Sequence, residues 1–400
     1  MGLTTFHPLS LSDFEISHER GFLPQDPCET LPDCSTLSYL GRELPKLLSA
    51  RKVREFIDGH HSLLDSIPTS WGDREQRAAM RILSFAGHAY VWEAPDQPVS
   101  TLPRQLALPW SEIAQRLGRP PVLSYASYAL DNWRRLDPAK PIQLDNIVLL
   151  QNFLGGQDEE WFVVVHIQIE RQAGPGLAGL LQAINGAGED REDEVFLGLK
   201  SLATSQMAMR DTLLCMTERC DPYVYYTRVR PYIHGWKNNP ALPNGLLYEG
   251  VAAYKGEAQQ FRGETGAQSS IVPCMDAGLG IFHAPDPLTV YLQEMRTYMP
   301  PHHQAFLQAL ELASEGHGRS LLSEYVRNRR PRRPELWAAY CACVDLLAQF
   351  REIHIGFADS YIHRQHQALA SNPTSVGTGG TPFMAYLQKH LDETRRMIAD

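Results

Sequence analysis

Residues 335–363, ELWAAYCACVDLLAQFREIHIGFADSYIH, decide the fold of this chain. Their large side chains recur at steps of three and four, which places them on one face of an α-helix. The residues of this face are Tyr340, Val344, Leu347, Phe350, His354, Phe357 and Tyr361. The stretch therefore predicts a long helix that is buried along one side and carries an imidazole, that of His354, in the middle of its apolar stripe.

The imidazole of His354 has two interpretations. Spacing alone favours a core histidine whose nitrogens are hydrogen-bonded, because most buried polar groups are satisfied in this way. The alternative is an axial metal ligand that points into an apolar cavity. Arg351 lies one turn earlier, where it can pair with an anionic group beside the same face. A haem would use a histidine on its iron, an arginine for a propionate and apolar walls.

Composition places the chain among globular proteins. It has 400 residues, 43% of them hydrophobic, which is enough for one large core or two domains. The net charge of −9 argues against a nucleic-acid partner, because phosphate binding needs a basic face. Seven cysteines without a CxxC pair predict a reducing, cytoplasmic setting. We also expect neither a signal peptide nor a membrane span, since no apolar run is long enough.

Helical periodicity dominates the rest of the chain. The helices predicted from three-and-four spacing lie at 46–58, 72–93, 121–135, 176–187, 192–217, 285–297, 302–315 and 382–398. Short extended segments are predicted within 102–109 and 141–152. Residues 161–170, WFVVVHIQIE, alternate and are β-branched, which favours a strand. They also place Phe162 and His166 on one helical face, so a helix stays open.

A break in the pattern at residues 155–158, GGQD, suggests a domain boundary. We therefore predict a smaller mixed domain over 1–153 and a larger helical domain over 154–400. Near the C-terminus, residues 377–381, GTGGT, form a loop of small residues that is suited to close over a ligand.

A second unusual stretch, residues 225–237, mixes aromatic residues with two arginines: YYTRVRPYIHGWK. Arg230 in this stretch is able to hold a carboxylate through a bidentate pair. A structural salt bridge is the commoner role of a single arginine. The usual phosphate-loop, HExxH and GxSxG motifs are missing from the sequence, so these residues and His354 remain as the candidates for a functional site.

Together, these segments resemble the indoleamine 2,3-dioxygenase family of haem enzymes. The matching positions, in family order, are 120–126, 132–133, 230, 235–240, 247–250, 268–270, 276, 279–281, 296, 298–302, 351, 354 and 377–381. The resemblance runs from about residue 100 to the C-terminus. It implies a mainly α fold in which a small N-terminal domain covers a large all-helical domain that holds haem b. It also makes residues 158–173 a helix, against the strand that their residue types favour.

The resemblance implies roles for individual residues. His354 falls on the proximal iron ligand, and Arg230 falls on the arginine that binds the substrate carboxylate. Thr378 and Gly377 fall in the loop that closes over the amino-acid end of the substrate. The implied pocket walls are Tyr125, Tyr128, Phe162, Tyr225 and Gly266, and the implied supporting pair on the proximal side is Arg351 with Asp276.

Several positions depart from the family pattern. His166 stands where these enzymes usually have a distal serine, whereas the related tryptophan 2,3-dioxygenases have a distal histidine. A neutral imidazole there can accept a hydrogen bond from the indole N–H. Tyr128 stands where a smaller residue is common, Tyr225 where phenylalanine is usual, and residues 264–266 differ from the usual small-residue run. These changes make the pocket tighter or more polar.

The resemblance thus implies that O₂ adds across the indole C2–C3 bond of L-tryptophan or a close derivative to give N-formyl-kynurenine. We expect ferrous haem b, an electron donor that keeps the iron ferrous, and a cytoplasmic monomer without nucleic-acid or membrane partners. His166 would position the substrate first and accept a proton only secondarily. Two alternatives stay open. One is a haem-dependent hydroxylase or ring-rearranging enzyme acting on an aromatic amino acid in secondary metabolism, and the other is a non-catalytic haem sensor or carrier.

Overall fold

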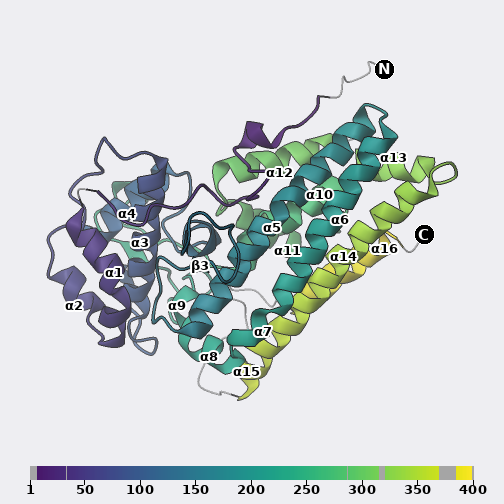
Figure 1. Ribbon diagram of the computed structural model, residues 1–400. Helices are drawn as coiled ribbons and strands as arrows, with labels where there is room; N and C mark the ends of the chain where they lie inside the picture. Colours follow the sequence, from purple (N-terminus) through teal and green to yellow (C-terminus); the bar gives the residue numbers. More distant parts are fainter. Residues whose placement is uncertain (1–6, 33, 286, 315–319, 369–383, 399–400) are drawn as a thin grey trace.

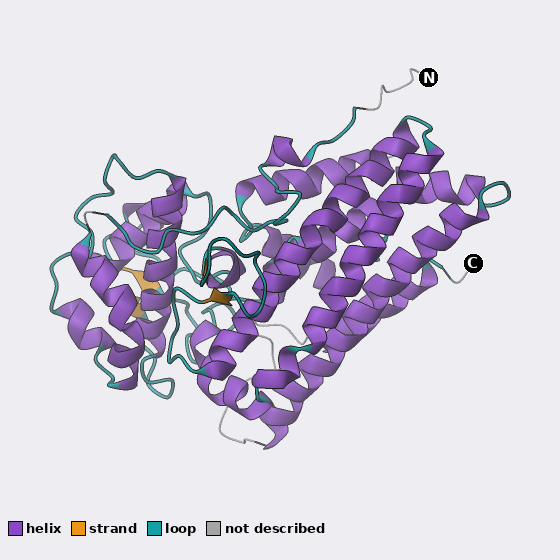
Figure 2. Ribbon diagram, in the orientation of Figure 1, coloured by secondary structure: helices purple, strands orange, loops and turns teal. Residues whose placement is uncertain are grey.

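The computed structural model describes residues 7–32, 34–285, 287–314, 320–368 and 384–398. Most of these residues are helical, and each strand among them is only two residues long (Figures 1 and 2). This confirms the predicted mainly α fold class. Among the described helices, none combines the length and the apolar character that crossing a membrane would need.

The α-helices fall into two groups along the chain. The first group is α1 (Ser35–Ser49), α2 (Val53–Asp58), α3 (Asp73–Trp92) and α4 (Arg104–Arg116). The second is α5 (Gln157–Gly188), α6 (Glu192–Leu214), α7 (Met216–Arg219), α8 (Pro222–Val224), α9 (Arg230–Ile233), α10 (Ile271–Leu279), α11 (Pro287–Arg296), α12 (Pro301–Ser314), α13 (Leu321–Arg329), α14 (Pro334–Ala358), α15 (Arg364–Ala368) and α16 (Met384–Arg396). The first group lies on the left of Figure 1 and the long helices of the second group lie on the right, while α9 lies between them.

Shorter elements complete the described chain. The 3₁₀-helices are η1 (Leu11–Phe14), η4 (Ala252–Tyr254) and η5 (Gly266–Gln268). The π-helical turns are η2 (Ala126–Leu130), η3 (Tyr225–Val229) and η6 (Asp359–His363). The strands are β1 (Thr101–Leu102), β2 (Arg134–Arg135), β3 (Ile147–Val148) and β4 (Leu247–Tyr248), with β1 parallel to β4 and β2 antiparallel to β3.

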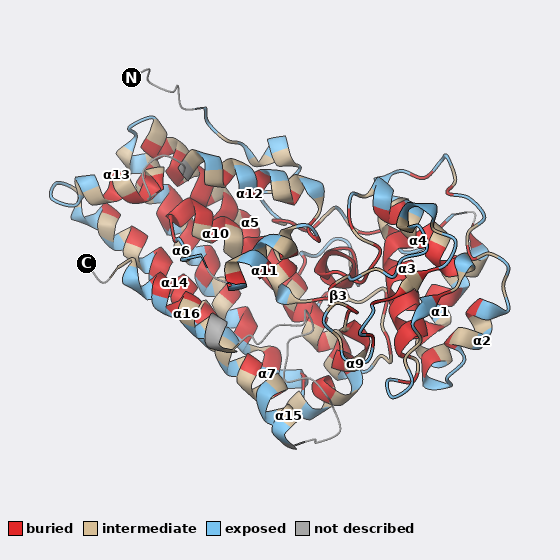
Figure 3. Ribbon diagram, turned by 180° about the vertical axis from the view of Figure 1, so that it is seen from behind, coloured by how far each residue is buried: buried red, intermediate tan, exposed pale blue. Residues whose placement is uncertain are grey.

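The larger helix group is a bundle of long helices around α5. Helix α5 packs along α6, while α14 packs against α6 and α16. The backbones of α5 and α6 approach closely where Gly179 meets Gly198, and a Cβ added at Gly198 would lie 2.6 Å from the Ala183 nitrogen. Buried residues line the inside of both helix groups (Figure 3). The bundle therefore holds His354 on α14 and His166 on α5 in fixed positions.

Residues 161–170 are helical, so the strand favoured by their residue types was wrong. They belong to α5, whose buried residues lie on several sides of the helix. Such a helix shows little amphipathic period, and a run of valine and isoleucine then looks like a strand. Packing against α6, α10 and η2 overrides the β propensity of these residues. The helix implied by the family resemblance is the structure that forms.

Three other predictions of local structure need correction. Within 121–135, only the turn η2 is helical, and it is followed by β2. Within 102–109, Leu102 belongs to β1 and Pro103 is extended as predicted, but α4 begins at Arg104, so the extended segment ends there. The helix predicted at 46–58 divides at Arg51, whose φ of 53° ends α1 before α2 begins.

The boundary between residues 153 and 154 stays a prediction. Strand β4 and helix α9 follow that boundary in sequence but pack against β1 and α3 of the first helix group. The first helix group therefore packs partly against residues from the second half of the chain. Its expected α/β-mixed character also stays a prediction, since β1, β2 and β3 are so short.

Candidate functional site

His354 lies near the C-terminal end of α14, which spans Pro334–Ala358. His354 is exposed, yet the protein around it lowers the pKa of the imidazole to about 4. Burial is the main cause, followed by the charges of His166 and Arg351. A side chain that borders an internal space is exposed and yet has protein atoms densely packed around it, and His354 combines these two properties. His354 is therefore a neutral imidazole, the form that binds a metal.

His166 approaches the same space from α5. Its Nδ1 lies 2.7 Å from the carbonyl oxygen of Phe162. A carbonyl only accepts hydrogen bonds, so Nδ1 carries the proton and Nε2 carries a lone pair. Burial lowers the pKa of His166, which keeps the ring neutral. His166 thus presents a hydrogen-bond acceptor close enough to His354 to influence its pKa.

Aromatic rings line the space beside His166. Phe162 lies 4.7 Å from the His166 ring and 4.5 Å from the Tyr225 ring, measured between centroids. Tyr125 meets His166 edge to face at 6.1 Å, and Tyr128 lies 6.4 Å from Phe162. These rings form a continuous wall contributed by α5, η2 and η3. Such a wall suits a flat aromatic substrate.

Arg230 lies next to this wall and is fully buried. It follows η3 directly, so the turn that carries Tyr225 also sets the position of Arg230. Its guanidinium carbon lies 5.2 Å from the Tyr226 ring. Burial lowers the pKa of Arg230, although Tyr225 and Tyr226 act to raise it. The guanidinium of an arginine nevertheless stays protonated in proteins. A buried permanent cation favours an anionic partner such as a carboxylate.

All three π-helical turns of the described chain lie at this site. Turn η2 carries Tyr128 and starts after Tyr125, η3 begins with Tyr225, and η6 follows the helix of His354 and carries Tyr361. Tyr361 lies 5.7 Å from Tyr225. Turns of this kind insert an extra residue into a helix and are frequent at functional sites, because they re-aim side chains. The sequence gives no local signal for them.

Gly266 opens η5 beside the aromatic wall. A Cβ added at Gly266 would meet no atom within 4 Å, so this residue also borders open space. The same short helix holds Gln268, whose side-chain oxygen accepts a hydrogen bond of 2.9 Å from the backbone nitrogen of Tyr125. Element η5 is thereby attached to the start of η2.

Two buried carboxyl groups at this site went unassigned in the sequence. Burial raises the pKa of Glu264 to about 8 and that of Glu170 to about 7. Glu170 accepts a hydrogen bond of 2.8 Å from the Ser269 hydroxyl and lies against Tyr125. In the sequence, Glu264 was indicated only by the difference between residues 264–266 and the small-residue run that is usual in the family. The partner of Glu170 lies 99 residues away, beyond any local pattern.

Arg351, on the same helix as His354, forms an ion pair with Asp276 of α10. The Nη2 of Arg351 lies 2.6 Å from Oδ2 of Asp276, and its Nη1 donates to the Thr394 hydroxyl at 2.8 Å. Burial alone would raise the pKa of Asp276, but Arg351 and His283 outweigh it and lower that pKa. The role of this pair toward a bound group stays a prediction. Thr378 and Gly377 lie outside the described residues.

The arrangement fits a haem. It provides a neutral imidazole, that of His354, which would hold the iron, an arginine–aspartate pair one turn away, and partly exposed apolar side chains such as Phe350 and Phe357 on the same helix. The distal side adds an acceptor, an aromatic wall and a buried cation. These are the parts needed to hold and orient a zwitterionic aromatic substrate.

Comparison with known proteins points to one family. A family model described as "Indoleamine 2,3-dioxygenase" matches residues 10–397. The human protein named indoleamine 2,3-dioxygenase 2 is 34% identical over 404 residues, covering 98% of this chain and 96% of its own length. Rat indoleamine 2,3-dioxygenase 1 is 34% identical over 406 residues, covering 97% and 95%. Indoleamine 2,3-dioxygenase of Saccharomyces cerevisiae is 33% identical over 442 residues, covering 98% and 94%.

Proposed function

Because the chain belongs to the indoleamine 2,3-dioxygenase family of haem-dependent dioxygenases, we propose that it opens the indole ring of L-tryptophan or a close derivative. O₂ would add across the C2–C3 bond, and both oxygen atoms would stay in the product, N-formyl-kynurenine. Haem b, when bound, supplies the ferrous iron for this oxygen chemistry. The contribution of the protein is to bind, orient and enclose the substrate.

One observation carries this proposal. Two neutral histidines, His354 on α14 and His166 on α5, face the same space, and the buried Arg230 adjoins it through Tyr225. His354 would hold the iron. Arg230 would bind the substrate carboxylate, which sets the direction in which the side chain enters. The indole would then lie against Phe162 and Tyr225 with its N–H toward Nε2 of His166.

His166 acts chiefly by position in this proposal. Its Nδ1–H is held by the Phe162 carbonyl, so Nε2 is fixed as an acceptor with the correct tautomer. An indole nitrogen that donates to Nε2 brings C2 and C3 to a defined place. The substrate loses its translational and rotational freedom when it binds, so this entropy cost does not add to the barrier of the chemical step. Thr378 and Gly377 stay predicted members of a loop that closes the site.

A product assay tests the reaction. The purified protein, loaded with haem and reduced, would be given L-tryptophan, ring-substituted tryptophans and L-tyrosine under isotopically labelled O₂. We expect N-formyl-kynurenine carrying two labelled oxygen atoms. Hydroxylated or rearranged products in its place would contradict the proposal. The cytoplasmic location, the monomeric state and the electron donor stay predictions.

The iron-ligand assignment has its own test with a matched control. His354→Ala should abolish the Soret band of the haem-loaded protein, because the axial imidazole is removed. His363→Ala is the control, since His363 is an exposed histidine nine residues later that pairs with Asp359. Equal haem absorbance in both variants would refute the role of His354.

Polar groups beside the aromatic rings favour a second candidate reaction. The hydroxyl of Tyr128 is buried and finds no hydrogen-bond partner among the described residues, and Glu264 is buried in the same region. Hydroxylation or rearrangement of a more polar aromatic amino acid would use these groups. Turnover of L-tyrosine or a hydroxylated indole without formyl product would favour this reaction. We do not retain the sensor or carrier alternative, because the named relatives are dioxygenases.

A further inference from the structure

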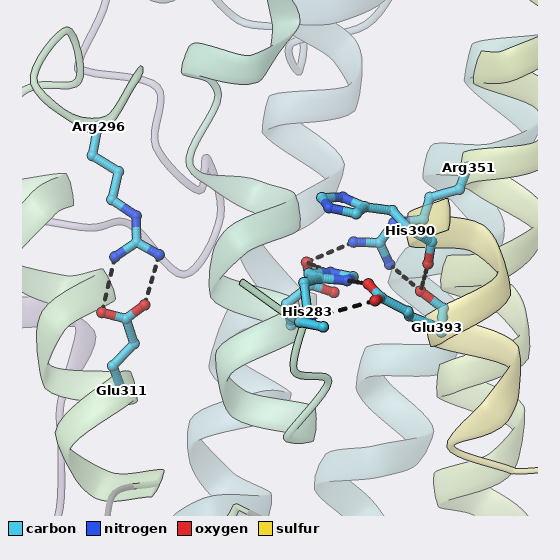
Figure 4. A network of polar contacts seen from close by, with 9 residues as sticks. His283, Arg296, Glu311, Arg351, His390 and Glu393 are labelled. Carbon is cyan, nitrogen blue, oxygen red and sulfur yellow. Dashed lines mark hydrogen bonds and ion pairs between the residues drawn. The ribbon is translucent and has the colours of Figure 1, made fainter. Parts of the chain in front are cut away.

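A cluster of two histidines and one glutamate lies next to the Arg351–Asp276 pair. His283 comes from the segment between α10 and α11, while His390 and Glu393 come from α16 (Figure 4). The Nδ1 of His283 lies 2.6 Å from Oε2 of Glu393, and its Nε2 lies 3.3 Å from Oδ2 of Asp276. One ligand atom from each of the three residues lies within 4.8 Å of the other two.

The cluster is shielded from solvent. His390 is 8% exposed and Glu393 is 9% exposed, while the side chain of His283 is 11% exposed. His390 and Glu393 are three residues apart on α16, so their side chains leave the same face of that helix. His283 reaches them from a separate segment that is 107 positions away from His390 in the sequence.

The Nε2 atom of His390 is buried and has no hydrogen-bond partner among the described residues. Buried polar atoms are satisfied in the great majority of cases, so such an atom calls for an explanation. Burial, reinforced by the charges of His283 and Arg351, lowers the pKa of His390 to about 4. His390 is therefore a neutral imidazole, the form that coordinates a metal ion.

We propose that His283, His390 and Glu393 bind a divalent transition-metal ion of the zinc class. Two imidazole nitrogens and one carboxylate oxygen are a known three-ligand set for Zn²⁺, with a fourth position taken by water. The surroundings fit this role. Asp276 lies at Nε2 of His283, so it can accept the Nε2–H while Nδ1 faces the ion. Metal-bound histidines usually donate their second nitrogen to a carboxylate in this way.

Coordination requires a modest adjustment of the rings. The imidazoles of His283 and His390 are stacked, with centroids 3.8 Å apart and planes 12° apart. Their lone pairs must converge on the ion, so at least one ring must turn about its Cβ–Cγ bond, a torsion with a broad range in histidine. Oε2 of Glu393 would exchange its contact with Nδ1 of His283 for a bond to the ion.

Nearby charges set how binding depends on pH. The groups that face the cluster are Asp276, Arg351 and Lys389, whose Nζ lies 3.5 Å from Oε1 of Glu393. Burial favours the neutral form of His283, but Asp276 and Glu393 outweigh it and raise its pKa. Imidazole and carboxyl ligands must be deprotonated to bind a metal ion, so affinity should increase as the pH rises.

A bound ion would fasten α16 to the segment before α11. Helix α16 packs against α14, the helix of His354. The ion would therefore stabilise the packing behind the candidate haem side without taking part in the reaction. This site goes beyond the proposed function and does not depend on it.

Zinc titration of the full-length, haem-loaded and chelator-treated protein tests the proposal. We expect one Zn²⁺ per chain by calorimetry and a higher melting temperature with Zn²⁺ present. His390→Ala and Glu393→Gln should each weaken binding by at least about 100-fold, since a lost ligand costs more than a lost supporting group. His363→Ala, which removes an exposed histidine elsewhere, should bind like the unchanged protein.

Cobalt distinguishes this site from the seven free cysteines. Co²⁺ bound by nitrogen and oxygen lacks the intense charge-transfer absorption of cobalt thiolates. A thiolate spectrum, no binding, or equal affinity in Glu393→Gln and the unchanged protein would overturn the proposal. Glu393→Gln keeps the size of the side chain, so it remains informative if His390→Ala does not fold. Because no substrate is present, failure here leaves the dioxygenase proposal intact.

Discussion

Replacing His166 by serine tests the distal side of the site most directly. The 2.7 Å contact between Nδ1 and the Phe162 carbonyl leaves Nε2 as the acceptor for the indole N–H. A neutral hydrogen bond contributes about 0.5–1.5 kcal/mol net, which corresponds to about 2- to 13-fold in kcat/KM. We therefore expect His166→Ser to lower kcat/KM for L-tryptophan by a factor in this range.

The comparison with 1-methyl-L-tryptophan makes this prediction specific. This substrate has no N–H, so it leaves Nε2 of His166 unpaired in a closed pocket, at a cost of about 1–3 kcal/mol. The unchanged protein should discriminate against it by about 5- to 160-fold in kcat/KM. His166→Ser should reduce that ratio, because it removes the imidazole acceptor at the position of Nε2, and the shorter serine side chain makes space for the methyl group.

Steady-state kinetics on both substrates with both proteins give the coupling between His166 and the indole nitrogen. An equal loss for the two substrates would refute the hydrogen bond and reduce His166 to a packing residue. The pH profile is a second check. Burial lowers the pKa of His166 below the ordinary 6.5, so the ring stays neutral above that pH and kcat/KM should be flat there. A break above 6.5 that disappears in His166→Ser would contradict this account.

The remaining predictions concern binding, ionisation and packing. Arg230→Lys should raise KM for L-tryptophan by about 10- to 100-fold, because the bidentate fork is lost, but it should leave KM for tryptamine unchanged; equal effects on both would exclude carboxylate binding. Glu264→Gln should gain stability relative to the unchanged protein as the pH rises from 4.5 to about 8. The sign follows from a folded-state pKa above the unfolded value: the stability contributed by Glu264 is present at low pH and is lost as the pH rises. Thermal melts across that range measure it, and parallel curves would contradict the raised pKa. Gly198→Ala should lower stability by about 1–3 kcal/mol, because its Cβ would meet backbone at the α5–α6 crossing. Gly356→Ala, which meets nothing within 4 Å, is the control, and equal melting temperatures would be evidence against the close crossing.

The helix of His354 could be predicted from the sequence because its signal is local. Apolar residues at helical spacing over 335–363 correspond to α14 and the turn η6 that continues it. Helix α5 could not be predicted from residue types, since burial on several sides removes the amphipathic period. Its identification as a helix needed the family resemblance. The helix predicted over 121–135 was wrong in another way, since the segment forms only the π turn η2 and the strand β2.

The candidate site divides in a similar way. The family resemblance singled out His354, Arg230 and His166, and their roles stay predictions. The contacts that position them were not predictable, because they join distant segments. Ser269 meets Glu170 across 99 residues, and His283 meets Glu393 across 110. Such pairs leave no periodic trace, and only the packing of α5, α10, α14 and α16 brings them together.

The polar groups of the distal side bear on which substrate the site prefers. His166, Tyr128 and Glu264 place an imidazole, a hydroxyl and a carboxyl group in a region otherwise walled by aromatic rings. A substrate that covers such a group without hydrogen-bonding to it loses about 1–3 kcal/mol for each one. One extra methylene in an apolar pocket changes the binding free energy by a similar amount. A site built to hydrogen-bond a substrate OH or NH, however, rejects an analogue that lacks this OH or NH far more strongly. Substrate choice should therefore follow the positions of donors on the indole more closely than its size. A substituent that adds a donor beside Tyr128 or Glu264 should be accepted where a methyl group of similar volume is not.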